Sequence, residues 1–283
     1  MIRLIADSGS TKTDWCVCQS RRTLQRITTQ GINPFHQSPE EIAKIILELT
    51  EQLNDRNRIE RVEFYGAGCA LPEKKEVLRR ILSTHLLHCS DIFVTSDLMG
   101  AAIATCQGKP GIACILGTGS NSCQFDGADI VANTPSLGYI LGDEGSGSHL
   151  GRVLVSDCLK NQLPPHICQL FFKEYSLNQA TVLENVYRKP LANRYLAGFT
   201  PFLNKYREEP AIHALLIGCF KTFFQRNVFA YDTTLPIHFI GSIAYHFKEE
   251  ITEAAQLCGL NIGRIFKAPM EGLIESYPKK EEE

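Results

Sequence analysis

The chain has 283 residues, of which 44% are hydrophobic and 21% are charged, a composition typical of a globular protein with a substantial core. This composition excludes a disordered chain. Lys and Arg number 29 against 31 Asp and Glu, and the formal net charge of −2 offers no positive field for nucleic acid. At roughly 100–200 residues per domain the length favours two domains, and two domains leave a cleft that suits an enzyme.

Charged residues interrupt every apolar run before the about 18 residues that a membrane span requires, so we expect a soluble protein without a membrane partner. The N-terminus reaches Asp7 after a short apolar run, unlike a secretory signal. The 11 cysteines are an odd number and include no Cys-x-x-Cys pair. Reduced thiols of a cytoplasmic protein explain them better than a disulfide framework.

The first third of the chain is predicted to be mixed α/β. Apolar runs at 2–6 and 15–18 predict two strands joined by a polar turn, which makes a β-hairpin. Ser38-Pro-Glu-Glu41 matches a capping box, and isoleucine and leucine recur at helical spacing behind it. Further periodicity predicts strands at 62–65 and 92–95 and helices at about 73–87 and 98–106.

The opening plan of strand, polar turn and strand returns after the turn cluster Gly108-Lys-Pro-Gly111, at 112–116 and 122–125. We therefore expect one domain at 1–108 and a second at 109–283. The stretch from 146 to about 230 is mostly helical with proline breaks, followed by a strand at 237–240 and helices at 245–257 and about 270–283. We expect the last helix to pack back on the first domain.

Two turns have the composition of phosphate-binding loops. Asp7-Ser-Gly-Ser-Thr-Lys-Thr13 offers small residues, hydroxyl and amide donors and one lysine, and Gly117-Thr-Gly-Ser-Asn121 offers the same without a cation. Each alone is better explained as a plain β-turn, because Gly, Ser and Asp dominate ordinary turns. Neither matches a Walker A loop or a Rossmann glycine motif. Together they predict a polyphosphate held from both domains.

Asp97 is the candidate general base. It follows the strand predicted at 92–95 and precedes a helix, where a carboxylate is well placed to accept the proton of a substrate hydroxyl. The same position is also that of a helix N-cap without chemical duty. Residue pattern alone leaves both interpretations open.

Five motifs in order give the chain a specific resemblance. They are Asp7-x-Gly-x-Thr-Lys-Thr13, Ser96-Asp97-x-x-Gly-Ala-Ala102, Leu116-Gly-Thr-Gly-Ser-Asn121, Gly138-Tyr-Ile-Leu-Gly-Asp-Glu-Gly-Ser146 and Phe239-Ile-Gly-Ser-Ile-Ala244. This order resembles the N-acetylglucosamine kinase family, among the ATPases related to 2-hydroxyacyl-coenzyme A dehydratase activators, within the actin, hexokinase and heat-shock chaperone superfamily. The resemblance implies two ribonuclease H-like α/β domains flanking a nucleotide and sugar cleft, ATP and Mg²⁺ as cofactors, and a homodimer.

The resemblance also assigns roles to residues. Asp97 resembles the base that takes the proton of the sugar 6-hydroxyl, and Asp7 would lie near the magnesium ion. Positions matching nucleotide or phosphate contacts are Asp7, Gly9, Ser10, Thr11, Lys12, Thr13, Gly117, Thr118, Gly119, Ser120, Gly241 and Ser242. Positions matching sugar contacts are Asn33, Asp97, Asn121, Ser136, Leu137, Gly138 and Asp143.

Structural interpretations of some of these residues stay open. Asn33 precedes a proline and suits a turn, Asp143 suits a helix cap, and Gly241-Ser242 suits a helix start. Ser136-Leu137-Gly138 stands where better-known members carry Gly-Trp-Gly beside the acetamido group, which puts the sugar's 2-substituent in question.

Other functions compete with a sugar kinase that phosphorylates N-acetylglucosamine. An ATPase activator with an iron–sulfur cluster needs exposed thiolates in glycine-flanked turns, whereas most cysteines here fall in predicted strands and helices. A repressor-related kinase needs a compact Cys and His zinc cluster, which the sequence lacks. A non-catalytic sugar sensor would need neither both phosphate loops nor Asp97.

Overall fold

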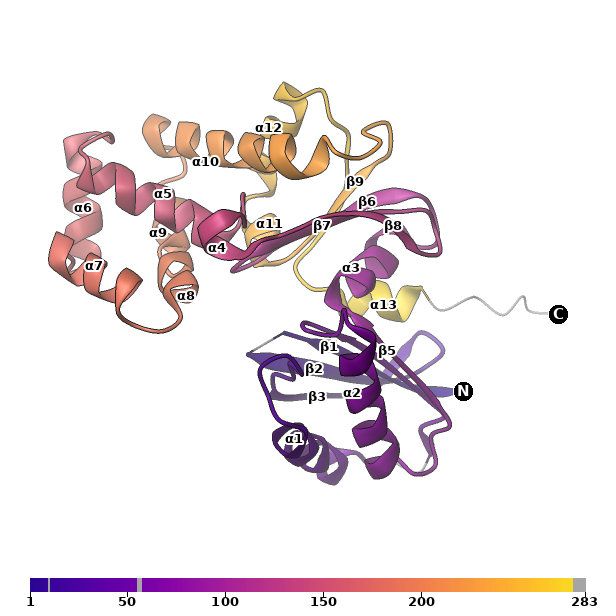
Figure 1. Cartoon of the computed structure of the whole chain (residues 1–283). Helices are drawn as coiled ribbons and strands as arrows, with labels where there is room; N and C mark the ends of the chain where they lie inside the picture. The colour runs from indigo at the N-terminus through magenta and orange to yellow at the C-terminus, as the bar shows by residue number, and fades with distance from the viewer. Residues whose placement is uncertain (10, 55–57, 277–283) are drawn as a thin grey trace. The chain divides into compact units, whose positions relative to one another are not determined.

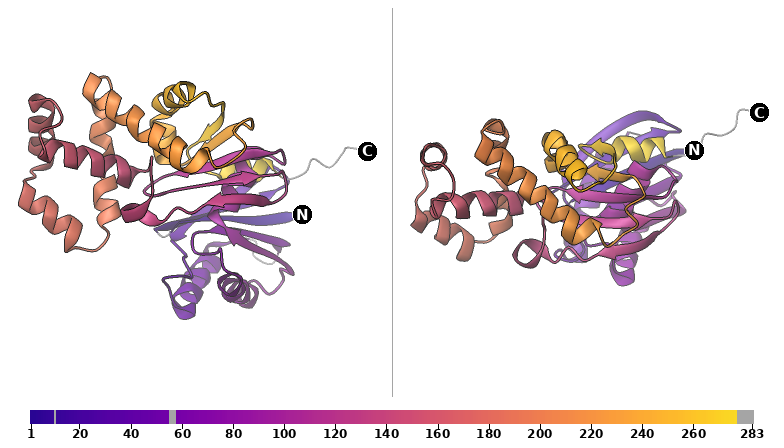
Figure 2. Two further views of the ribbon diagram at one scale, coloured as in Figure 1. Left: turned by 45° about the horizontal axis from the view of Figure 1, so that its top comes forward. Right: turned by 90° about the horizontal axis from the view of Figure 1, so that it is seen from above.

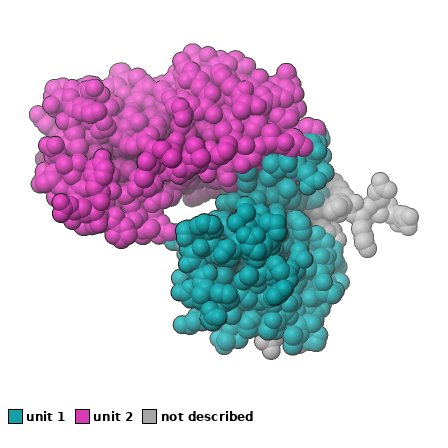
Figure 3. Space-filling view, viewed as in Figure 1, with its two compact units in different colours: residues 1–109, 126–130, 268–283 teal, residues 110–125, 131–267 magenta. Residues whose placement is uncertain are grey.

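The computed structural model describes residues 1–9, 11–54 and 58–276. The chain folds into two compact units (Figure 3). Unit 1 comprises Met1–Lys109, Asp126–Ile130 and Ala268–Glu283, and unit 2 comprises Pro110–Phe125 and Val131–Lys267.

Unit 1 is built on a five-stranded sheet in the order β3-β2-β1-β4-β5. The strands are β1 (Ile2–Ser8), β2 (Lys12–Gln19), β3 (Arg22–Gln30), β4 (Arg61–Gly66) and β5 (Asp91–Ser96). β1, β2 and β3 pair antiparallel, which confirms the predicted hairpin, and β1, β4 and β5 pair parallel. β3 was not predicted, because Ile27 is the only one of its nine residues that is buried.

The helices of unit 1 lie on both faces of this sheet and are α1 (Pro39–Gln52), α2 (Pro72–His85), α3 (Asp97–Cys106) and α13 (Met270–Glu275). α1 begins at the predicted capping box of Ser38 and Glu41, and it packs beside α2 (Figure 1). α13 packs closely on α3, since a Cβ at Gly272 would meet the Ala104 carbonyl oxygen at 2.3 Å. The C-terminal helix therefore completes unit 1.

Unit 2 repeats this topology with the order β10-β9-β6-β7-β8. The strands are β6 (Gly111–Leu116), β7 (Ser120–Phe125), β8 (Ile130–Thr134), β9 (Ile237–Ile240) and β10 (Ile262–Phe266). β6 and β7 form an antiparallel hairpin, and β9 and β10 add parallel strands beyond β6. Each unit thus has a hairpin loop at the equivalent place in its sheet, and the mixed α/β fold class is confirmed.

The helices of unit 2 carry most of its core. They are α4 (Gly138–Leu141), α5 (Gly147–Leu159), α6 (Pro165–Tyr175), α7 (Gln179–Tyr187), α8 (Ala192–Ala197), α9 (Thr200–Lys205), α10 (Pro210–Phe223), the π-helix η2 (Phe224–Val228), α11 (Ser242–His246) and α12 (Lys248–Leu257). Figure 2 shows α6 to α9 grouped beyond the strands. The helix predicted at 245–257 is two helices, since α11 ends where Phe247 turns into the buried core. Among the described residues, no helix has the length and apolarity to cross a bilayer.

Candidate active site

The β1–β2 loop of unit 1 exposes the first group of predicted phosphate-binding atoms. Gly9 donates its N–H to the Lys12 carbonyl at 3.0 Å, and a Cβ at Gly9 would meet only that oxygen, at 3.9 Å. The backbone is therefore open to a close ligand. Lys12 is held by the Asp14 carboxylate at 2.6 Å, and Thr11 is exposed. Ser10 lies outside the described residues.

Thr13 has a different environment from its loop neighbours. It is fully buried, and its hydroxyl shares a 2.6 Å hydrogen bond with the Ser8 hydroxyl. Ser8 in turn donates to the Ile32 carbonyl at 3.0 Å. Through Ser8, the Thr13 hydroxyl therefore connects the β1–β2 hairpin to the segment around Ile32 by hydrogen bonds.

Asp7 and Asp97 are half-buried carboxylates of unit 1, and the charge of Asp97 acts on Asp7. Burial and the charges of Asp14 and Asp97 raise the pKa of Asp7 to about 7, against the opposing charge of Lys12. Burial also raises the pKa of Asp97, although its Oδ1 accepts a hydrogen bond from the Leu98 N–H at 2.9 Å. The pKa of each carboxyl group is therefore closer to neutral pH than that of a free carboxyl group, as is common for acid–base groups in active sites.

The N-cap of α3 is Ser96, whose hydroxyl accepts from the Met99 N–H at 3.2 Å. Asp97 is the first helical residue. The interpretation of Asp97 as the helix N-cap is therefore wrong, and its second carboxylate oxygen can accept a hydrogen bond from a ligand.

Asn33 forms the turn that its sequence context indicated. It is buried, and its Oδ1 accepts the Phe35 N–H at 3.0 Å while its carbonyl accepts from His36 and Gln37. The turn interpretation is confirmed. A role in sugar contact stays a prediction.

The β6–β7 loop of unit 2 is braced by the first turn of α5. Gly147 donates its N–H to the Gly117 carbonyl at 2.8 Å, and Ser148 donates to the Thr118 carbonyl at 3.0 Å. Thr118 is exposed, and a Cβ at Gly117 would meet nothing within 4 Å. The loop is thus fixed from one side and open on the other.

Asp143 lies directly against this loop. Its Oδ1 accepts the Ser120 N–H at 3.2 Å, and a Cβ on Gly119 would lie 2.9 Å from its Oδ2. Its own N–H donates to the Ser136 carbonyl at 3.1 Å. Burial raises the pKa of Asp143. The N-cap of α5 is Ser146, so the interpretation of Asp143 as a helix cap is wrong.

Three other predicted residues of unit 2 have distinct surroundings. Gly241 has φ 125° and would place a Cβ 2.1 Å from the Leu116 carbonyl oxygen, so it lies against the end of β6. It is also the N-cap of α11, as its sequence allowed, and Ser242 beside it is exposed. The Asn121 Oδ1 accepts from the Asn133 side chain at 3.1 Å.

The segment Ser136-Leu137-Gly138 leads into α4. Leu137 has φ 58° and is 62% exposed, and Gly138 follows with φ 71°. Ile140 and Leu141 are also strongly exposed, so this short helix presents aliphatic side chains outward. The structure therefore brings Ser120, Ser136 and Asp143 into direct contact, with Leu137 at the margin.

Sequence reasoning missed a group of side chains behind Asp143. The Glu144 carboxylate pairs with Arg226 and accepts from Asn227 at 3.3 Å, and His149 accepts the Gly145 N–H at 3.1 Å. Arg226 stands 82 residues from Glu144. No spacing in the sequence signals that pairing.

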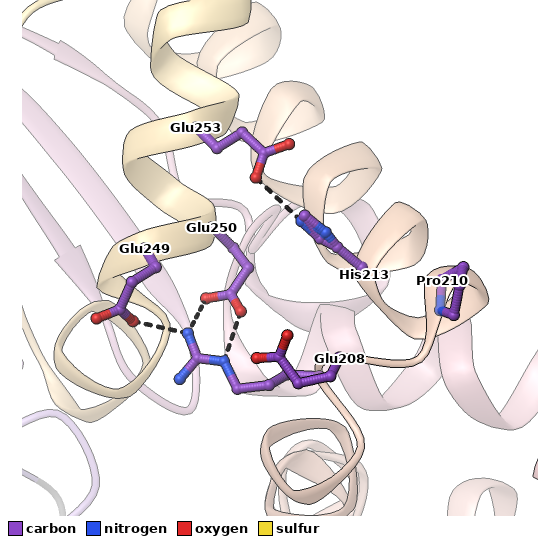
Figure 4. Close-up of a pocket in the computed structure, with 7 residues that line it drawn as sticks. Glu208, Pro210, His213, Glu249, Glu250 and Glu253 are labelled. Carbon is purple, nitrogen blue, oxygen red and sulfur yellow. Dashed lines mark hydrogen bonds and ion pairs between the residues drawn. The ribbon is translucent and has the colours of Figure 1, made fainter.

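A surface pocket of about 590 Å³ lies elsewhere in unit 2, between the start of α10 and α12 (Figure 4). It is lined by Arg207, Glu208, Pro210, His213, Glu249, Glu250 and Glu253. Arg207 is held by both Glu249 and Glu250, and His213 by Glu253 at 3.0 Å. The pocket contains none of the predicted site residues.

No protein-family model matches the chain, and no curated protein sequence matches it. Among solved structures, the chain is similar to a candidate N-acetylglucosamine kinase from Porphyromonas gingivalis, with 47% identity, coverage of 96% of this chain and 97% of that one, and a TM-score of 0.91.

Two more distant structures share the fold. One is a candidate N-acetylglucosamine kinase from Chromobacterium violaceum, with 17% identity, coverage of 98% and 99%, and a TM-score of 0.70. The other is a ROK family glucokinase from Streptomyces griseus in complex with glucose and AMPPNP, with 12% identity, coverage of 98% of both chains and a TM-score of 0.59. With two units of one topology and a 47% identical relative along nearly its whole length, the chain belongs to the N-acetylglucosamine kinase-like family of sugar kinases, in the actin, hexokinase and heat-shock chaperone superfamily.

Proposed function

We propose that this sugar kinase transfers the γ-phosphoryl group of ATP to the 6-hydroxyl of an amino sugar, with N-acetylglucosamine as the preferred substrate. The similarity to the Porphyromonas gingivalis protein supports the sugar class. The observation that carries the chemistry is the environment of Asp97, a half-buried carboxylate that is not needed as a helix cap.

In this proposal Asp97 accepts the proton of the 6-hydroxyl as that oxygen attacks phosphorus. A base works best when its pKa lies close to the working pH, and burial moves the pKa of Asp97 upward from its ordinary value. The hydrogen bond from the Leu98 N–H fixes one carboxylate oxygen at 2.9 Å and leaves the other for the substrate. Positioning a single hydroxyl in this way supplies much of what phosphoryl transfer needs from a protein.

Asp7 would hold the magnesium ion. A carboxylate oxygen is a ligand that Mg²⁺ prefers, and the neighbouring charges of Asp14 and Asp97 make a cation favourable there. When bound, Mg²⁺ neutralises charge on the phosphates. The open space beside Gly9 and Gly117 would let phosphate groups approach the two loops closely, and the exposed Thr11 and Thr118 would donate hydrogen bonds to phosphate oxygens, as glycine-rich turns do elsewhere.

Asp143 would accept hydrogen bonds from sugar hydroxyls, because a carboxylate can accept several such bonds at once. One oxygen is already held by Ser120, which fixes the direction of the other. Asn33 and Asn121 would add polar contacts. Exposed Leu137 would face the 2-substituent, where an apolar contact discriminates by only about 1–3 kcal/mol.

The test compares two adjacent residues. We expect Asp97→Asn to lower kcat by about 10²–10⁴-fold with ATP binding nearly unchanged, because only proton transfer is removed. Ser96→Ala removes the true helix cap, so it should cost about 1 kcal/mol of stability and leave kcat close to that of the wild type. A near-normal kcat in Asp97→Asn would refute the assignment of the base.

A further inference from the structure

Asp143 has a left-handed backbone conformation, which is uncommon among residues other than glycine. Its φ is 56°, in the left-handed region that side chains with a Cβ rarely adopt. Such a conformation persists where surrounding contacts fix it, and it is common at ligand sites. Its amide and its carbonyl are both used, by the Ser136 carbonyl and by the Ser146 N–H at 3.1 Å each. The residues that follow Asp143 are held by further contacts.

The next residue, Glu144, is held from the π-helix η2. It is 8% exposed, its Oε1 accepts from the Arg226 guanidinium, and its Oε2 accepts from the Asn227 amide at 3.3 Å. Burial alone would raise the pKa of Glu144, but the hydrogen bonds and charge around it lower the pKa overall. A single-turn π segment is a recurrent feature of functional sites, and here it directs Arg226 and Asn227 toward one carboxylate.

Gly145, one residue further, is held from the other side. Its N–H donates to the His149 Nδ1 at 3.1 Å, which requires that nitrogen to be unprotonated. Burial and the charge of Arg152 lower the pKa of His149 to about 4, so the imidazole is neutral at physiological pH. The Ser146 hydroxyl fixes His149 in turn by accepting its backbone N–H at 3.2 Å.

We propose that Arg226 and His149 are positioning residues for the sugar: through Glu144 and Gly145 they fix the turn that presents the Asp143 carboxylate. This inference rests on the proposed function of Asp143. Neither residue needs to touch the substrate. Their loss frees the turn, so it should weaken sugar binding more than nucleotide binding or the chemical step.

The experiment uses the full chain and measures kcat and separate KM values for N-acetylglucosamine and ATP. We expect Arg226→Gln to raise the sugar KM about 10- to 100-fold, the equivalent of one charge-assisted hydrogen bond, and to leave the ATP KM and kcat within about threefold. Arg188→Gln is the matched control, since Arg188 makes an exposed pair with Glu184 on α7. It should behave as the wild type.

A rescue pair tests His149. His149→Ala should raise the sugar KM, whereas His149→Asn places an acceptor oxygen near the position of Nδ1 and should restore most of the loss. If the wild type turns over normally and the sugar KM is unchanged in both Arg226→Gln and His149→Ala, the positioning inference is overturned while the proposed function stands. Parallel rises in both KM values overturn it too, in favour of a general structural role. A wild-type chain without sugar-dependent turnover would overturn the proposed function and this inference with it.

Discussion

Replacing Gly119 by alanine is expected to weaken sugar binding through Asp143. The new Cβ would lie 2.9 Å from the Asp143 Oδ2 and 3.2 Å from its Cγ, closer than such contacts tolerate. Asp143 has little freedom to retreat, because its backbone N–H is bonded to Ser136 and its Oδ1 to Ser120. The carboxylate must therefore turn away and give up the hydrogen bond from the Ser120 N–H.

The magnitude follows from the proposed hydrogen bond to the sugar that the displaced Asp143 carboxylate would lose. A hydrogen bond to a charged group contributes about 1.5–3 kcal/mol, which corresponds to about 10- to 150-fold in affinity. Gly117→Ala is the matched control in the same loop. A Cβ at Gly117 meets nothing within 4 Å, so this substitution should leave the sugar KM close to that of the wild type.

The assay follows ADP release while the sugar and ATP concentrations are varied separately. We expect the sugar KM of Gly119→Ala to rise by at least about tenfold above that of Gly117→Ala. Equal sugar KM values in two folded variants would refute the reasoning, because they would show that Asp143 does not contact the sugar or does not respond to its neighbour.

Two further substitutions test the electrostatics and the packing. In the absence of magnesium, Asp7→Asn should stabilise the protein by at most about 4 kcal/mol at pH 8. The pKa of Asp7 rises from 3.8 to about 7 on folding, so the wild-type protein loses stability as the pH rises through that window. Urea unfolding should show that the gain in the free energy of unfolding vanishes near pH 4, and a gain independent of pH would contradict the assignment. Gly241→Ala should cost more than about 2 kcal/mol in the same assay, because its Cβ would lie 2.1 Å from the Leu116 carbonyl oxygen. Gly108→Ala, at a glycine with φ 73° and open space around it, should cost about 1 kcal/mol, and equal losses would argue against the close packing at Gly241.

Local sequence signals predicted the elements with strong apolar patterns. The hairpin of β1 and β2 and the helix behind Ser38 were predicted because a buried strand pair and a capping box are visible in neighbouring residues. β3, β8 and β10 were missed, since their residues are largely exposed or half-exposed and lack a clear alternation of apolar side chains. Edge strands of this kind are stabilised by pairing that the sequence does not display.

The sequence suggests which residues form the candidate site, and their functional roles stay predictions, whereas it does not reveal the contacts between them. Motif order identified Asp97, Gly119 and Asp143. The sequence did not reveal that Ser96 caps α3 or that Gly119 abuts the Asp143 carboxylate, because both depend on backbone geometry. That both phosphate loops act on one polyphosphate stays a prediction.

The most direct test of the central claim measures ADP release by the purified protein in the presence of ATP and Mg²⁺. The sugars compared are N-acetylglucosamine, glucosamine, N-acetylmannosamine, N-acetylmuramic acid and glucose. Analysis of the product then shows whether the 6-position is phosphorylated. The proposal predicts sugar-dependent ADP release with the highest kcat/KM for N-acetylglucosamine and partial activity on neighbouring sugars, since apolar discrimination at Leu137 is worth only roughly 10–200-fold. A higher kcat/KM for glucose would contradict the amino-sugar assignment, and ADP release that no sugar stimulates would contradict the proposed reaction itself.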